Sequence, residues 1–197
     1  MLYEVPLTRI SEMADVSAEA FIANNDPIGN FMFKDEPGHL ILKKRFFRSL
    51  VTSCSSKSLR QAISVNLEAI SIWFPPGMSH LEDADVDPFS EKDFANPETP
   101  KRMQAVNEVI SALTAHLGTE PQWYLHLVAV QPQFRGEGYS SQLIRPMLEK
   151  AAKENIACTL ITQSFENARK YEHWGFVVVK EMPVPGSGEK FYSMRKG

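Results

Sequence analysis

The stretch that decides the fold is VAVQPQFRGEGYSS, which occupies residues 128–141. The apolar run Trp123–Val130 leads into it and is typical of a buried strand. Pro132 ends this strand, because proline has no N–H to donate to a sheet ladder. A helical pattern then begins at Glu137 or Gly138 and continues to about Glu154. The stretch is therefore a strand that passes through a glycine turn into a helix.

The turn in this stretch carries groups that suit a phosphate. Gly136 and Gly138 have no Cβ, so the backbone can approach a ligand closely. The first N–H groups of the following helix have no partner inside the helix, and the helix dipole favours an anion there. Arg135 adds a positive charge and a planar fork that matches phosphate oxygens. These features predict an anion site, with a ligand-free turn as the alternative.

Three kinds of phosphate site compete for this turn. A nucleoside triphosphate loop needs Gly-Lys-Ser/Thr, whereas Gly138 is followed by Tyr139 and Ser140. A dinucleotide turn needs a third glycine or alanine, and Ser141 stands in that place. A cradle for the pyrophosphate of coenzyme A remains as the third interpretation.

The order of predicted elements indicates an α/β or α+β sheet with at least one parallel crossover. After residue 122 the pattern is strand, helix, strand, helix, strand, strand, with the later strands at 157–162, 176–179 and 190–194 and a helix at 167–174. The first half predicts strands at 2–5, 61–65 and 69–74 and helices from about residue 11, at 40–51 and at 101–116. Residues 24–38 and 82–100 are predicted to be loops.

Composition excludes several classes of protein. A chain of 197 residues with 43% hydrophobic and 23% charged residues predicts one globular domain over residues 1–197. Its net charge of -3 argues against a dedicated nucleic-acid binder, and no apolar run is long enough for a membrane helix. Cys54 and Cys158 form no disulfide or ligand pattern, so we expect a cytoplasmic protein, with the nucleus as an alternative, and no metal.

Acidic residues concentrate in one stretch, residues 82–100. It contains seven Asp or Glu residues against Lys92, together with three prolines. We expect a surface loop within the single domain rather than a linker between domains. Its acids offer an attraction for a cationic amine, although a simple solvated loop explains them as well.

Two motifs together resemble the GNAT superfamily of N-acyltransferases. Gln133-x-x-Gly136-x-Gly138 after the strand is similar to the acyl-CoA motif of that superfamily, and Asn167 to Phe176 resembles its second signature, Asn-x-x-x-Tyr-x-x-x-Gly-Phe. The resemblance covers about residues 123–179. Residues 71–77, SIWFPPG, are similar to a strand end in relatives of puromycin N-acetyltransferase.

This resemblance implies a fold and a cosubstrate. The fold is a mixed, mostly antiparallel, twisted sheet of about six to seven strands flanked by helices. In such enzymes the strand 123–130 splays away from the parallel strand 157–162, and acetyl-CoA binds in the gap. The residues implied in binding it are Val128, Ala129, Val130, Gln133, Arg135, Gly136, Glu137, Gly138, Tyr139, Ser140 and Asn167.

The resemblance also implies catalytic roles. Tyr171 stands where the superfamily places a general acid, which would protonate the departing thiolate. His126 is our first candidate for the general base, because it alternates with Tyr124 and Val128 on a strand and imidazole titrates near working pH. Serotonin N-acetyltransferase is similar in having a histidine there. A buried structural histidine, Glu68 or a water chain are the alternatives.

The acceptor is the least defined part of the prediction. Phe31, Trp73 and Trp123 are expected to line its pocket. We expect direct acetyl transfer to a small primary amine, by a monomer or homodimer. A lysine or protein N-terminus, a coenzyme A-binding module without catalysis, and an interaction domain are the alternatives.

Overall fold

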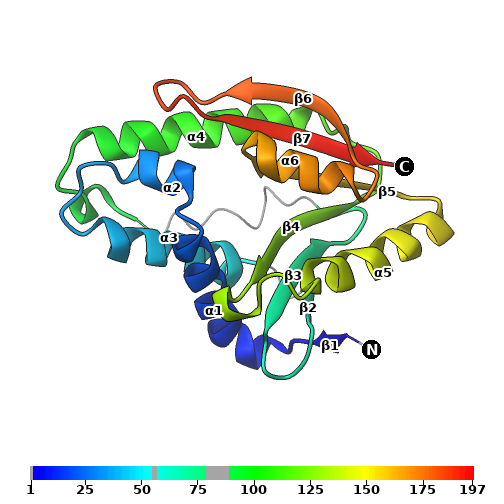
Figure 1. Ribbon diagram of the computed structural model, residues 1–197. Helices are drawn as coiled ribbons and strands as arrows, with labels where there is room; N and C mark the ends of the chain where they lie inside the picture. The colour runs from blue at the N-terminus through cyan, green and yellow to red at the C-terminus, as the bar shows by residue number, and fades with distance from the viewer. Residues whose placement is uncertain (1, 55–56, 79–88) are drawn as a thin grey trace.

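A computed structural model describes residues 2–54, 57–78 and 89–197. Its described strands form one seven-stranded sheet in the order β1-β2-β3-β4-β5-β7-β6 (Figure 1). Only β4 and β5 run parallel, and all other neighbours are antiparallel. This confirms the predicted mixed, mostly antiparallel sheet. The strands are β1 Tyr3–Glu4, β2 Leu59–Ala62, β3 Ala69–Phe74, β4 Gln122–Val130, β5 Ala157–Gln163, β6 Val177–Pro183 and β7 Lys190–Lys196.

The helices flank this sheet. They are α1 Ile10–Ala23, α2 Pro27–Met32, α3 His39–Thr52, α4 Glu98–Ala115, α5 Tyr139–Glu154 and α6 Phe165–Glu172, with short 3-10 turns at Leu7–Arg9, Glu91–Asp93 and Pro132–Phe134. The prediction of an unbroken loop over residues 24–38 was wrong, because α2 lies inside it. Asp26 caps α2 by accepting from the N–H of Gly29, and Pro27 has the fixed φ that suits the first helical position.

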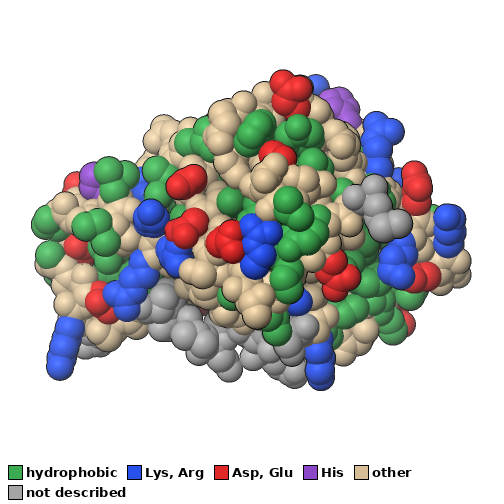
Figure 2. Space-filling view, turned by 90° about the horizontal axis from the view of Figure 1, so that it is seen from below, with side chains coloured by type: hydrophobic (Ala, Val, Ile, Leu, Met, Phe, Trp, Pro, Cys, Tyr) green, Lys and Arg blue, Asp and Glu red, His purple; other side chains and the backbone are tan. Residues whose placement is uncertain are grey.

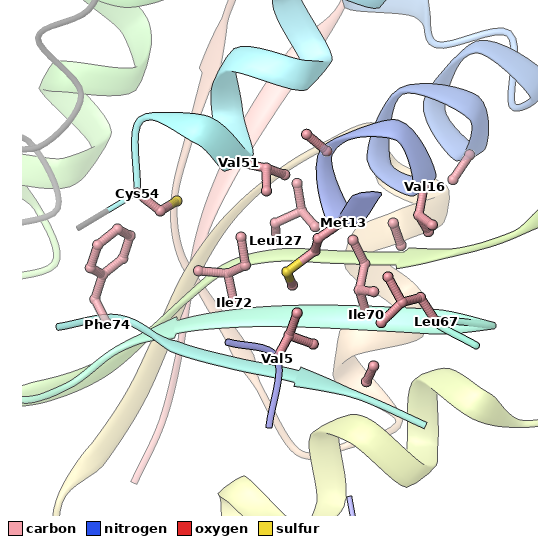
Figure 3. Packing of buried hydrophobic residues seen from close by; sticks show 14 of the residues in the cluster. Val5, Met13, Val16, Val51, Cys54, Leu67, Ile70, Ile72, Phe74 and Leu127 are labelled. Carbon is pink, nitrogen blue, oxygen red and sulfur yellow. The ribbon is translucent and has the colours of Figure 1, made fainter. Parts of the chain in front are cut away.

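One face of the sheet packs against α1 and α3. Met13 of α1 and Val51 of α3 lie over Ile70 and Ile72 of β3 and Leu127 of β4, as Figure 3 shows. Side chains on a strand alternate between faces, so these positions share one side of the sheet. Burial of this apolar surface fixes α1 and α3 on the sheet.

The opposite face of the sheet packs against α5 and α6. Leu125 of β4 and Leu160 of β5 join Ile144 of α5 and Ala168 of α6 in a second buried cluster. A third cluster, which includes Met32 of α2, Val106 of α4 and Phe191 of β7, lies under α4. The sheet thus separates an α1/α3 side from an α5/α6 side, and a ligand that enters between two strands can touch both.

Part of the acidic stretch is described by the structure. Asp93 pairs with Arg45 at 2.7 Å, and Glu98 pairs with Lys101 at 2.6 Å inside the first turn of α4. α4 begins at Glu98, three positions before the start that the sequence predicted at about Lys101. Residues 82–88 of the predicted acidic loop lie outside the described residues.

Surface charge on the described residues is mixed. Figure 2 shows Lys and Arg side chains interspersed with Asp and Glu over one whole face, rather than gathered by sign. Within the described ranges, no helix is long and apolar enough to cross a membrane. The sheet itself begins near the N-terminus and ends with β7, one residue before the last one.

The α1 contact with the sheet can be tested by a truncation. Met13 is fully buried, so Met13→Ala should lower the free energy of unfolding by about 2–5 kcal/mol through lost apolar contact and a residual cavity. The matched control is Val65→Ala, whose side chain is 57% exposed and should change stability by no more than about 0.5 kcal/mol. Urea titration of both variants measures the difference. Equal losses would contradict this packing.

Candidate active site

The central feature of the site is the place where β4 and β5 part. Their parallel ladder pairs Gln122 with Ala157 at one end and Leu125 with Leu160 at the other. β4 continues beyond Leu125 and β5 continues beyond Leu160, but among the described residues no further pair joins the two strands. Backbone N–H and C=O groups of β4 near Val128 therefore face a gap in the middle of the sheet. Such a strand edge is suited to pairing with an extended ligand.

A β-bulge on β4 turns His126 toward the α1/α3 side. The register between β3 and β4 shifts after Ile72, and His126 is the extra residue on β4. Tyr124 packs in the cluster under α1, whereas Val128 packs against the cluster under α5. We expected His126, Tyr124 and Val128 to share one face of the strand. This is wrong for Val128, because the extra residue shifts every later side chain of β4 to the opposite face.

His126 is held by a backbone carbonyl of α3. Its Nε2 lies 2.9 Å from the oxygen of Leu50, and its ring meets that of Phe74 edge-on at 5.3 Å. A carbonyl can only accept, so Nε2 carries the proton and Nδ1 keeps its lone pair. Burial lowers the pKa of His126, and the Leu50 carbonyl opposes that shift. The imidazole is therefore neutral at pH 7, with Nδ1 as its basic atom.

The glycine turn after β4 is open to a ligand. Gly136 and Gly138 have φ of 89° and 73°, a conformation that other residues rarely adopt, and a Cβ at either would meet nothing within 4 Å. Among the described residues, no acceptor binds the backbone N–H groups of residues 136–138. Acidic side chains are also absent from the first turn of α5. Free donors and the positive end of a helix dipole thus converge here.

Arg135 does not aim its side chain at this turn. Its Nη2 donates to the carbonyl of Ala20 at 2.9 Å, and its Nη1 lies 3.5 Å from that of Ala23. The guanidinium therefore satisfies carbonyls at the C-terminal end of α1. The backbone N–H of Arg135 also donates to a carbonyl, that of Pro132, at 3.4 Å. The structure therefore directs Arg135 toward α1 rather than toward the turn, and its expected contact with a phosphate stays a prediction.

Gln133 orders the turn from within. Its Nε2 donates to Oε1 of Gln131 at 2.6 Å, and Nε2 of Gln131 donates to the carbonyl of Leu67 at 2.8 Å. The N–H of Gln131 also donates to the carbonyl of Glu68. These bonds tie the turn to the β2–β3 connection. The observed contacts of Gln133 therefore order the loop, and its expected role in binding acetyl-CoA stays a prediction.

Tyr171 and Asn167 lie on α6, four residues apart on the same helix face. Tyr171 is half-buried, with its ring edge-on to Trp174 at 5.6 Å and to Phe176 at 5.9 Å. Burial raises the pKa of Tyr171 above that of an ordinary phenol, so the hydroxyl keeps its proton at neutral pH. Asn167 lies in the first turn of α6, and its N–H donates to Oγ of the capping residue Ser164 at 3.3 Å.

Two residues expected in the acceptor pocket lie in the core instead. Trp73 has no exposed surface and Trp123 only 7%, and both pack in the cluster under α5. The indole of Trp123 donates to Glu154 Oε2 at 2.8 Å. Phe31 is half-buried, and its ring lies against the β6–β7 connection at Gly186. The expectation for Trp73 was wrong because β3 is buried on both faces. The expectation for Trp123 was wrong because this residue lies where β4 is still paired with β5, and its side chain packs under α5.

Glu68, the alternative base, is a weak one in this structure. Its carboxylate accepts from Ser64 Oγ at 2.8 Å. Hydrogen bonds from its own backbone N–H and from Ser64 and Asn66 outweigh desolvation and lower the pKa of Glu68. Its position at the β2–β3 connection also places it beside Gln131, just past the end of β4, whereas His126 lies in the middle of that strand.

Asp26 is a buried carboxylate at the end of β5 that the sequence did not reveal. It is only 4% exposed; its Oδ2 accepts from the N–H of Gly29 and its Oδ1 accepts from Nε2 of Gln163 at the end of β5. Burial raises the pKa of Asp26 to about 6, against the opposing bond from Gly29. The Asp-Pro pair in the sequence signals a helix cap, and nothing in it signals burial beside β5. Within the described residues, no His, Cys, Asp and Glu group could hold a metal.

Comparison with known proteins places this geometry in a family. The acetyltransferase (GNAT) domain family matches residues 90–197. An uncharacterized N-acetyltransferase of Schizosaccharomyces pombe is 25% identical over 134 residues, which are 61% of this chain and 52% of that protein. The chain therefore spans about half the length of this curated relative.

Solved structures share the fold over the whole chain. A histone acetyltransferase HPA2 and related acetyltransferase from Corynebacterium glutamicum is 20% identical with a TM-score of 0.65, covering 100% of this chain and 94% of that one. Arylalkylamine N-acetyltransferase 2 from Aedes aegypti is 15% identical with a TM-score of 0.63, covering 100% and 97%. At these identities the likeness concerns the fold alone. The specific similarity to puromycin N-acetyltransferase has no support among these comparisons.

The protonation state of His126 can be measured directly. NMR titration of its ring protons, assigned with His126→Gln, should give a pKa below 6.5, because burial disfavours the imidazolium. The ring should also show the Nε2–H tautomer in its nitrogen shifts. A pKa above 6.5 would mean that a charge or water stabilises the imidazolium, and the account of this site would then be wrong.

Proposed function

The chain belongs to the GNAT acetyltransferase domain family, and we propose that it moves the acetyl group of acetyl-CoA directly to a primary amine of a small molecule. The single observation that supports this most is the parting of β4 from β5 after Leu125, beside a donor-lined glycine turn. A gap with free backbone groups suits the pantetheine arm, and the turn suits the pyrophosphate. The gap lies along β4, and the turn follows the end of the same strand.

The residues that bind acetyl-CoA in this proposal act through their backbone. Val128 and Val130 pair with the pantetheine amides along β4, whereas Ala129, whose backbone groups face β3, contributes only the strand position between them. The N–H groups of residues 136–140, in the turn and the first turn of α5, hold the pyrophosphate. Asn167 on α6 reaches the pantetheine from the β5 side. Because backbone N–H groups supply this charge stabilisation, the net charge of -3 is compatible with an anionic cosubstrate.

The chemistry follows from where the side chains lie. The neutral amine attacks the thioester carbonyl, and a β4 N–H near Val128 stabilises the oxyanion. The C–S bond then breaks, and the Tyr171 hydroxyl donates its proton to the leaving thiolate. Nδ1 of His126, on the other side of the sheet, takes the proton that the amine loses. The raised pKa of Tyr171 and the lowered pKa of His126 keep the acid protonated and the base neutral at pH 7.

The test is a coenzyme A release assay with a panel of amines, together with calorimetry of acetyl-CoA binding. We expect binding and thiol release with at least one small primary amine. Binding without release from any amine, lysine peptide or protein N-terminus would leave a coenzyme A-binding module. Absence of binding at millimolar acetyl-CoA would overturn the proposal and favour an interaction domain.

A matched pair of glycine variants locates the cradle. Gly136→Asp should abolish acetyl-CoA binding in calorimetry, because it places a negative charge where the pyrophosphate sits. Gly118→Asp is the control, since Gly118 has a similar φ of 83° and open space around it but precedes β4, whereas the turn follows that strand. Both substitutions strain the backbone by a similar amount, about 1–3 kcal/mol. Retained binding in Gly136→Asp would place the cradle elsewhere.

The acid can be tested by removal of one oxygen. Tyr171→Phe keeps the ring contacts with Trp174 and Phe176 but has no proton to donate, so kcat should fall by about 10²–10⁴-fold with acetyl-CoA affinity retained. Tyr3→Phe on β1 serves as the control and should keep its kcat. An unchanged kcat in Tyr171→Phe would remove this residue from the mechanism.

A further inference from the structure

The glycine turn after β4 is tied by side chains to two other segments of the protein. At its start, Nε2 of Gln131 donates to the carbonyl of Leu67 at 2.8 Å, and Oε1 of Gln131 accepts from Nε2 of Gln133 at 2.6 Å. One residue before Gly136, Nη2 of Arg135 donates to the carbonyl of Ala20, in the last turn of α1, at 2.9 Å. The turn is thus held to the β2–β3 connection and to α1.

Gln131 binds two successive carbonyls of the β2–β3 connection. Its backbone N–H donates to the carbonyl of Glu68 at 2.9 Å, while its side chain donates to that of Leu67, the residue before. Leu67 is buried and has a φ of 56°, a left-handed conformation that is uncommon for residues other than glycine. Such a conformation persists only where the surrounding contacts hold it. The Gln131 side chain is one of these contacts, and an apolar side chain of the same length would remove it.

Arg135 complements the negative end of α1. The last carbonyls of a helix have no partner within it, and a cation at that end is stabilising. α1 has no basic residue in its own last turn. The guanidinium of Arg135 supplies the cation from outside the helix, and among the described residues it forms no ion pair with a carboxylate. Its charge therefore acts on α1 and offsets a negative helix end close to the proposed anion site.

These ties use none of the donors that an anion needs. The N–H groups of Phe134 and Arg135 donate to the carbonyls of Gln131 and Pro132, at 3.0 Å and 3.4 Å, and so close the first part of the turn on itself. Among the described residues, the N–H groups of residues 136–138 have no acceptor. The free donors thus begin where the tied part of the turn ends. Donors that are already fixed in place bind a ligand at a lower ordering cost than mobile ones.

Building on the proposed function, we infer that Gln131 and Arg135 are positioning residues for the pyrophosphate of acetyl-CoA. Their side chains fix the turn between the β2–β3 connection and α1, and the N–H groups of residues 136–138 then meet the phosphates. Neither side chain touches a phosphate, and Arg135 keeps its bond to Ala20 when acetyl-CoA is bound. This role differs from the direct phosphate contact that the sequence predicts for Arg135, and the two roles have different experimental consequences.

The first test compares acetyl-CoA with S-acetylpantetheine, which has the same thioester and pantetheine arm but no phosphate, as acetyl donors. Gln131→Met and Arg135→Met should each raise the KM for acetyl-CoA by about 10-fold, with kcat and the use of S-acetylpantetheine changed by about 2-fold or less. Arg135→Lys, which keeps a charged donor, should lose less than Arg135→Met. Gln104→Met is the control, because Gln104 is exposed on α4 and donates only to Glu108. Equal losses with both acetyl donors, or no loss, would overturn the inference.

A second readout does not depend on activity. The carbonyl carbon of Ala20 should have different NMR shifts in ligand-free wild type and Arg135→Met, because the variant removes a charged donor from that oxygen. Acetyl-CoA should leave the wild-type Ala20 signal in place while it shifts the amides of residues 136–138. Movement of that signal to its Arg135→Met position would show that Arg135 leaves α1 for the phosphate, and would overturn its positioning role. Failure of acetyl-CoA to bind wild type would contradict the proposed function, whereas binding without these effects would contradict only this inference.

Discussion

The parallel ladder between β4 and β5 stops at Leu125 and Leu160, and the proposed function depends on that interruption. A continuous ladder would satisfy every backbone group of β4 internally, and no extended ligand could pair with it. The sheet tolerates the gap because β4 keeps its antiparallel partner β3 along the other edge, while β5 keeps β7. α1 packs on one face of the sheet and α5 on the opposite face (Figure 1).

This gap divides the chemistry between two sides of one sheet. Tyr171 belongs to the α5/α6 side, and burial there keeps its phenol protonated. His126 and Asp26 belong to the α1/α3 side, and burial there keeps the imidazole neutral and makes the carboxylate costly to ionise. Desolvation is the largest cause of all three pKa shifts. The proposed acid Tyr171 and the proposed base His126 therefore need no contact with each other, because the thioester would lie in the gap between them.

The sequence predicted the parts of this molecule whose signals are local. Alternating elements predicted the sheet and its parallel pair, and the motifs at Gly136 and Tyr171 predicted the elements that flank the gap. The sequence did not predict the directions in which several side chains point. A one-residue bulge at His126 reversed the faces of β4, and Arg135 turned to the α1 carbonyls. Trp73 lies in a strand that is buried on both faces, where alternation gives no signal. Asp26 resembles a cap in sequence, and only tertiary packing buries it beside β5.

The most direct measurement is a titration of labelled protein with acetyl-CoA, followed through backbone amide chemical shifts. The account predicts that the largest shifts occur in three separate segments: the end of β4 at 128–130, the turn at 136–140, and the start of α6 near Asn167. Amides of β1 and β2 should remain unshifted, because these strands lie at the far edge of the sheet. Saturable shifts that leave residues 128–140 unaffected, or no shifts at millimolar acetyl-CoA, would contradict the claim that the gap between β4 and β5 is the acetyl-CoA site.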